Sequence, residues 1–162
     1  MTPSLVEEAA SLLALCRGRG WQLATAESCT GGLIAATLTA VAGSSDVVDR
    51  GFVTYSNAAK TEMLGVPAEV IAAHGAVSEP VAAAMAAGAL ARSTATAALA
   101  CTGIAGPGGG TAEKPVGLVY VACAVSDGRA QVERHIFPGD RESVRVATVQ
   151  AAFRMLQKAA GS

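Results

Sequence analysis

The 162-residue sequence has few aromatic residues, few lysines and almost no net charge. Aromatic side chains make up 4% of the chain, whereas alanine alone contributes 36 residues. Such a composition favours close-packed helices over a bulky aromatic core. The net charge of −1 and the lack of any local basic run argue against attraction to nucleic acid or to an anionic membrane. We therefore expect neither a nucleic-acid partner nor a membrane partner.

The cysteines and histidines show no metal-binding pattern. The four cysteines are widely spread with no C-x-x-C pair, and His74 and His135 are the only histidines. This spacing does not resemble a zinc site, so we expect neither metal nor cofactor. Isolated cysteines are typical of buried thiols in a cytosolic protein. The N-terminus lacks a signal-peptide pattern, and polar or glycine residues interrupt the uncharged stretches. The expected location is the cytoplasm.

Helical and strand-like patterns alternate along the chain, and the Asp-Gly turn of residues 126–129 predicts a late hairpin. This order predicts a three-layer α/β/α sandwich with a mixed, mainly parallel sheet and a late antiparallel hairpin, in one domain spanning residues 1–162. The alanine-rich face of residues 82–91 permits close helix contacts and favours a homodimer. Helices are predicted over 3–19, 31–41, 57–64, from 66 onward, 78–92 and 140–158, and strands over 21–26, 47–56, 95–101, 116–125 and 131–137.

The segment Thr25-Ala-Glu-Ser-Cys-Thr-Gly-Gly32 joins a predicted strand to a predicted helix. A serine at such a turn, Ser28, can present its hydroxyl to a ligand. Gly31 and Gly32 allow close approach of the backbone, and a helix start directs N–H groups toward negative charge. The alternative is that Ser28 or Thr30 merely caps the helix that follows.

Lys60 stands out among only three lysines. If Asn57 caps the next helix, Lys60 occupies the third helical position, where the helix dipole disfavours a positive charge. A neutral amine there suits a general base for a serine nucleophile. The phenol of Tyr55, at the predicted strand end, could lie close to this amine and relay a proton. The alternative is an ordinary solvated lysine beside a half-buried tyrosine.

A glycine-rich loop, residues 103–110, follows the predicted buried strand that ends at Cys101. It is neither a Walker A loop nor a Rossmann fingerprint, because a strand rather than a helix comes next. Backbone N–H groups at Gly103 and Gly106 could form an anion nest or oxyanion hole, with Thr102 at the rim. A flexible surface loop is the alternative.

Three polar positions complete the candidate set. Arg141 and Arg145, one helical turn apart, share a face that suits a phosphate, although with Glu142 they could equally form a solvated charge cluster. Ser45 follows Gly43-Ser44 and offers either a hydroxyl for a ligand or a turn cap.

Together these segments resemble the C-terminal domain of the CinA family, which includes stand-alone nicotinamide mononucleotide deamidases. The likeness covers nearly the whole chain, in order and with matching spacing. The matching pieces are Thr25-Ala-Glu-Ser-Cys-Thr-Gly-Gly-Leu33, Gly43-Ser-Ser45, Val53-Thr-Tyr-Ser-Asn57 with Lys60, Leu64-Gly-Val66, Gly75-Ala-Val-Ser78, Thr102-Gly-Ile-Ala-Gly-Pro107, Gly109-Gly-Thr111, Lys114-Pro-Val-Gly117 and Gly139-Asp-Arg141 with Arg145.

The resemblance implies hydrolysis of the carboxamide of nicotinamide mononucleotide to nicotinic acid mononucleotide and ammonia, without a metal. It implies Ser28 as nucleophile, activated by Tyr55 and Lys60, with Ser45 and Thr102 placing the substrate and Arg141 meeting the phosphate. An oxyanion site is expected at Gly31–Gly32 or at Gly103–Gly106. Two other functions stay open: a non-catalytic module that binds a nucleotide or a protein, and an esterase or amidase with an unrelated substrate.

Overall fold

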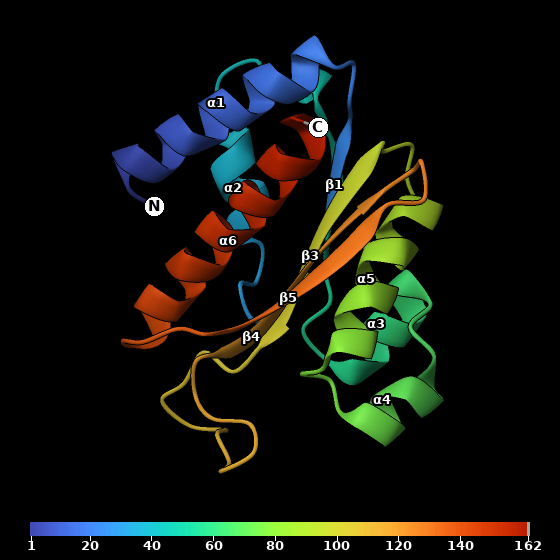
Figure 1. The fold of residues 1–162 in the computed structure, drawn as a ribbon, viewed down its shortest axis with the longest axis vertical. Helices are drawn as coiled ribbons and strands as arrows, with labels where there is room; N and C mark the ends of the chain where they lie inside the picture. Colours follow the sequence, from blue (N-terminus) through green and yellow to red (C-terminus); the bar gives the residue numbers. More distant parts are fainter. Residues whose placement is uncertain (162) are drawn as a thin grey trace.

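A five-stranded sheet forms the centre of the computed structural model, which describes residues 1–161 (Figure 1). The strand order is β2-β1-β3-β4-β5. β2, β1 and β3 are mutually parallel, and β4 is antiparallel to both of its neighbours. β4 is therefore the one reversed strand of this sheet, which confirms the predicted mixed sheet with its late hairpin. The strands are β1 (Leu23–Glu27), β2 (Val48–Val53), β3 (Ala97–Gly103), β4 (Leu118–Val125) and β5 (Ala130–Ile136).

Helices cover both faces of the sheet, as the three-layer prediction requires (Figure 1). Alternate residues of β3 contribute to two separate hydrophobic clusters, because successive strand side chains point to opposite faces. None of the helices in residues 1–161 combines the length and apolar character needed to cross a membrane. One face carries α1 (Pro3–Gly18), α2 (Leu33–Thr39) and α6 (Arg141–Gly161), and the other carries α3 (Asn57–Leu64), α4 (Ala68–His74) and α5 (Glu79–Ala91).

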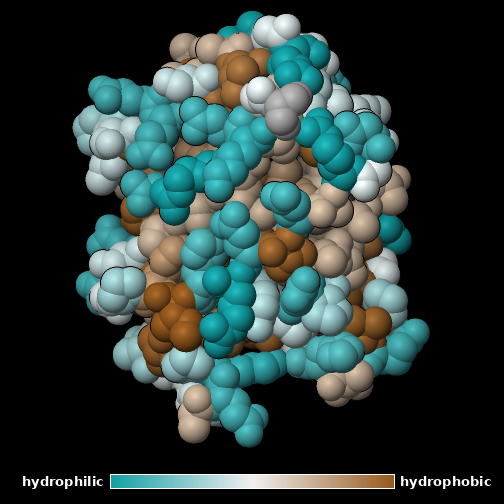
Figure 2. All heavy atoms as spheres, viewed as in Figure 1, coloured by the Kyte–Doolittle hydropathy of each residue, from teal (hydrophilic) through white to brown (hydrophobic). Residues whose placement is uncertain are grey.

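Small side chains let the second helical layer approach the sheet closely. The cluster under α5 is built largely from alanines of that helix and of β1, β3 and β4. This packing explains how a chain so poor in aromatic residues still buries a core on both sheet faces. On the face that Figure 2 shows, strongly hydrophobic residues appear in small separate groups between hydrophilic ones.

The starts of the two helices next to the candidate site differ from the prediction. α3 is capped by Ser56, whose hydroxyl accepts a hydrogen bond from the N–H of Ala59, so Asn57 is already helical and Lys60 is the fourth helical residue. α2 begins at Leu33 instead of residue 31, because Gly31 and Gly32 adopt positive φ angles of 57° and 104° before the helix starts. These differences leave Ser28 on the loop between β1 and α2.

Candidate active site

A pocket of about 290 Å³ lies at the carboxyl ends of β1 and β3. From β1 the chain continues into β2 on one side, whereas β3 pairs with β1 on the other. Such a switch point at the carboxyl ends of parallel strands is the usual ligand site of open α/β sheets. Ser28 and Lys60 line the pocket together with Thr102, Gly103 and Gly106.

Ser28 and Lys60 meet inside this pocket. The Nζ atom of Lys60 lies 3.0 Å from the Oγ atom of Ser28, although the two residues are 32 positions apart in the sequence. Both side chains are buried, with 8% of Ser28 and 1% of Lys60 exposed. A solvated lysine, the alternative interpretation, is therefore wrong. The contact depends on the pairing of β1 with β2, which continues through the hydrogen bond from the N–H of Thr54 to the carbonyl of Glu27.

The surroundings of Lys60 favour a neutral amine. Burial lowers the pKa of Lys60, and the nearby Cys29 and Cys101 thiols oppose this shift. The amine also lies 3.1 Å from the carbonyl oxygen of Thr54 and 3.4 Å from that of Tyr55. A neutral amine has two N–H donors and one lone pair. With the N–H groups directed at the two carbonyls, its lone pair can accept the hydroxyl proton of Ser28.

Ser28 is free for this contact because another residue caps α2. The buried carboxylate of Glu27 accepts hydrogen bonds from the N–H groups of Ile34 (2.8 Å) and Ala35 (3.0 Å) and from the hydroxyl of Thr30 (2.5 Å). The suggestion that Ser28 or Thr30 caps the helix is therefore wrong. The expected anion site at the start of this helix is also wrong, since the chain's own carboxylate occupies it.

The phenol of Tyr55 contacts Arg141 and not Lys60, which was its predicted neighbour. Its backbone carbonyl faces Lys60, but its phenol oxygen accepts a hydrogen bond of 3.0 Å from Nη2 of Arg141. The side chain is 62% exposed, so it is not half-buried packing either. The structure does not bring the phenol into hydrogen-bond contact with Lys60 or Ser28.

The glycine loop and Arg141 also line the pocket. Arg141 donates through Nη1 to the carbonyl of Gly106 (2.8 Å), which ties the loop to the start of α6. Thr102 is buried, and its hydroxyl donates to the carbonyl of Ala76 (2.8 Å). Gly103 and Gly106 line the pocket. Gly31 and Gly32 do not line the pocket, so of the two expected oxyanion sites only Gly103–Gly106 faces it.

Two predicted substrate-binding residues lie away from this pocket in the described chain. Arg145 donates to the carbonyl of Thr30 (2.9 Å), which fixes the loop behind Ser28 instead of lining the pocket. Ser45 is exposed on the short 3-10 helix η1 (Ser44–Asp46), immediately before β2. Because β1 and β2 are parallel, η1 lies at the amino ends of these strands and Ser28 at the carboxyl ends.

Comparison with known proteins assigns this architecture to a family. The sequence model of the CinA C-terminal domain matches residues 6–160. The chain belongs to the CinA C-terminal domain family. Curated relatives include CinA-like proteins of Syntrophobacter fumaroxidans, 57% identical over 140 residues, and of Mycolicibacterium gilvum, 56% identical over 153 residues. These matches cover 86% and 94% of this chain but 33% and 35% of the relatives, so the chain spans about a third of their length.

Solved structures of CinA proteins match the chain from end to end. The competence/damage-inducible protein CihA from Agrobacterium tumefaciens is 49% identical with a TM-score of 0.96, and the match covers 100% of this chain and 98% of that one. A CinA superfamily protein from Escherichia coli is 34% identical with a TM-score of 0.91, over 98% and 93% of the two chains. The fold of this CinA domain is thus shared with both.

Three pocket features of this CinA domain were not among the predicted site residues. Asn57 and Cys29 line the pocket, and Glu27 organises the loop that carries Ser28. The position of Asn57 at the start of the helix that carries Lys60 is a signal that could have identified it. For Glu27 the sequence offers no such signal, because a carboxylate in a strand-like run usually indicates an exposed position.

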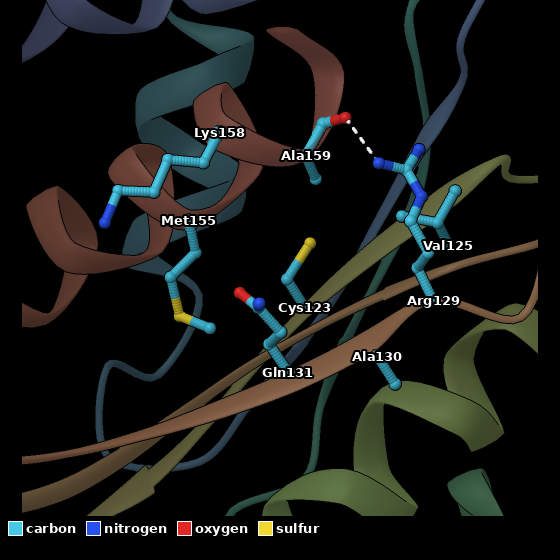
Figure 3. A pocket seen from close by; sticks show the side chains of 8 residues that line it. All are labelled: Cys123, Val125, Arg129, Ala130, Gln131, Met155, Lys158 and Ala159. Atoms are coloured by element: carbon cyan, nitrogen blue, oxygen red, sulfur yellow. Dashed lines mark hydrogen bonds between the residues drawn. The ribbon is translucent and has the colours of Figure 1, made fainter. Parts of the chain in front are cut away.

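A second cavity, of about 460 Å³, lies between the end of α6 and the β4–β5 hairpin (Figure 3). It is at the amino-terminal end of β3, since Val125 in its lining pairs with Ala97. Burial raises the pKa of its Cys123 thiol to about 12, which disfavours a reactive thiolate. Arg129 reaches the carbonyl of Ala159 (3.0 Å). The residues that line this cavity include Lys158 but no serine, so the pair of Ser28 and Lys60 has no counterpart among them.

Proposed function

We propose that this CinA domain is an amidohydrolase that converts nicotinamide mononucleotide to nicotinic acid mononucleotide and ammonia. The observation that carries the proposal is the buried contact of 3.0 Å between Ser28 Oγ and Lys60 Nζ in a pocket lined by glycines and an arginine. A serine hydroxyl needs a base to attack an amide, and a desolvated lysine is such a base. The family resemblance supplies the substrate.

The mechanism uses Ser28 as nucleophile and Lys60 as general base. The neutral amine of Lys60 takes the hydroxyl proton while Oγ attacks the carboxamide carbon. The Lys60 ammonium then gives this proton to the amide nitrogen, the C–N bond breaks, and ammonia leaves an ester on Ser28. Water attacks the ester, Lys60 accepts its proton and returns a proton to Oγ, and the carboxylate product is released.

Backbone N–H groups stabilise the oxyanion that forms on the carbonyl. Cys29 directly follows the nucleophile, and Gly106 also lines the pocket. Within residues 1–161 neither of these N–H groups donates to a protein oxygen, so both can donate to the substrate. One such donor contributes about 3–4 kcal/mol to transition-state stability in serine hydrolases. Arg141 provides the positive charge for the nucleotide phosphate.

The proposal is tested by measuring ammonia and nicotinic acid mononucleotide released from nicotinamide mononucleotide. We expect equal amounts of both products from the unaltered protein. Ser28→Ala should lower kcat at least about a thousandfold, since it removes the nucleophile, while substrate binding persists. The control is Ser126→Ala, an exposed turn serine that does not line the pocket, which should leave the rate unchanged.

The same assay separates the alternatives. A non-catalytic binding module would bind the nucleotide with no turnover in any variant, which would overturn the proposal. Turnover of unrelated amides or esters, with none of nicotinamide mononucleotide, would keep the Ser28–Lys60 chemistry but reject the substrate.

A further inference from the structure

Tyr55 has an arrangement that the hydrolysis steps leave unexplained. Its carbonyl oxygen lies 3.4 Å from Lys60 Nζ, whereas its phenol oxygen lies 3.0 Å from Arg141 Nη2. The residue lines the pocket and is 62% exposed, unlike the buried Ser28 and Lys60. The phenol thus belongs to the rim of the pocket, and Ser28 and Lys60 belong to its floor.

The amine of Lys60 has no position left for the phenol. A lysine nitrogen makes at most three hydrogen bonds, whether as donor or through its lone pair. Its three partners here are Ser28 Oγ, the carbonyl of Thr54 and the carbonyl of Tyr55. Proton transfer between Ser28 and Lys60 is therefore direct and needs no relay through a phenol.

The rim is instead suited to an anion. Arg141 uses Nη1 for Gly106 and Nη2 for Tyr55, and a guanidinium has five N–H donors, so donors remain for a ligand. Because the phenol oxygen accepts from Arg141, its own O–H hydrogen is free to donate. A cation and a hydroxyl donor side by side match a phosphate monoester, whose oxygens accept several charge-assisted hydrogen bonds.

We propose that Tyr55 is a specificity-determining residue, whose phenol is positioned by Arg141 and donates to the phosphate of a nucleotide substrate, and that it does not carry the proton of Ser28. This inference rests on the proposed function for the identity of the substrate. It assigns Tyr55 a role different from the activating role that the family resemblance implies.

Kinetics of Tyr55→Phe test the assignment with two substrates, nicotinamide mononucleotide and the same nucleoside without phosphate. Loss of the phenol O–H should raise KM for the nucleotide about tenfold or more and leave kcat within about twofold. The kcat/KM for the nucleoside should not change. The control is Tyr120→Phe, since Tyr120 lies on β4 outside the pocket. A fall in kcat with both substrates would establish a proton relay and overturn the inference.

A binding measurement distinguishes failure of this inference from failure of the proposed function. In the Ser28→Ala background, which cannot turn over, calorimetry compares the affinity for the nucleotide with and without Tyr55→Phe. We expect a loss of about tenfold to a hundredfold for the nucleotide and none for the nucleoside. Equal nucleotide affinity in both variants, or no nucleotide binding at all, would overturn the role of Tyr55. Absence of ammonia release from the unaltered protein would overturn the proposed function whatever the binding result.

Discussion

The proposed hydrolysis depends most on a lysine that folding removes from water. Lys60 is 1% exposed, and burial lowers its pKa. The sequence predicted a neutral amine here from an unfavourable helix position, whereas in the structure the pKa is lowered mainly by desolvation. The helix position was thus an incomplete reason for that prediction, because burial of a lysine side chain is not visible in a local pattern.

Glu27 is the second buried ionisable side chain of the site region, and its role can be tested by stability. The two carboxylate oxygens of Glu27 accept hydrogen bonds from the backbone N–H groups of Ile34 and Ala35. In Glu27→Gln an NH2 group replaces one of these oxygens and cannot accept, so one buried N–H loses its partner. We expect a loss of about 1–3 kcal/mol in the free energy of unfolding. Thermal unfolding at neutral pH measures this loss. The control is Glu113→Gln in an exposed loop, whose free energy of unfolding should stay within about 0.5 kcal/mol of that of the unaltered protein. Equal melting temperatures for both variants would contradict the capping role of Glu27.

The elements that hold Lys60 in place are α3 and the helix against which it packs. Gly88 of α5 lies so close to α3 that an added Cβ would be 2.0 Å from the carbonyl oxygen of Leu64. The two helices can approach this closely only because no side chain separates them. The position of α3, and with it that of Lys60, therefore depends on a glycine in a different helix.

Gly88→Ala should consequently destabilise the domain and disturb the site. Relief of the clash must move α5 from α3, at a cost of about 1–3 kcal/mol, and the shift should reduce ammonia release. Gly18→Ala is the matched control, because the Cβ added in α1 meets nothing within 4 Å. That change should stabilise the protein by about 0.5–1 kcal/mol through helix propensity. Similar effects of the two substitutions on thermal unfolding would contradict this packing argument.

At the scale of the whole molecule, the strand order decides which residues meet. Ser28, Lys60, Thr102 and Arg141 come from four distant segments, and the sheet order β2-β1-β3 brings them to one edge. Alternating helical and strand patterns were sufficient to predict the layers and the late hairpin, since these depend on local periodicity.

The order of strands, by contrast, depends on contacts that no local pattern shows. Ser45 illustrates the consequence. Its motif suggested a site residue, but the parallel pairing of β1 and β2 places η1 at the end of the strands remote from Ser28. Tyr55 is a similar case, because β2 ends at Val53 and the following loop directs its phenol to Arg141. Proximity in sequence to Lys60 therefore did not predict the partner of the phenol.

The pH dependence of ammonia release shows whether Lys60 is the base for Ser28. A base must be unprotonated, so kcat/KM should rise about tenfold per pH unit and then level off as Lys60 loses its proton. Because burial lowers the pKa of Lys60, this ionisation should lie below the ordinary value of 10.5. Lys60→Met should lower kcat/KM about 10²–10⁴-fold, and its pH profile should no longer show this ionisation. A Lys60→Met variant that keeps both the rate and the pH profile of the unaltered protein would show that Lys60 is not the base.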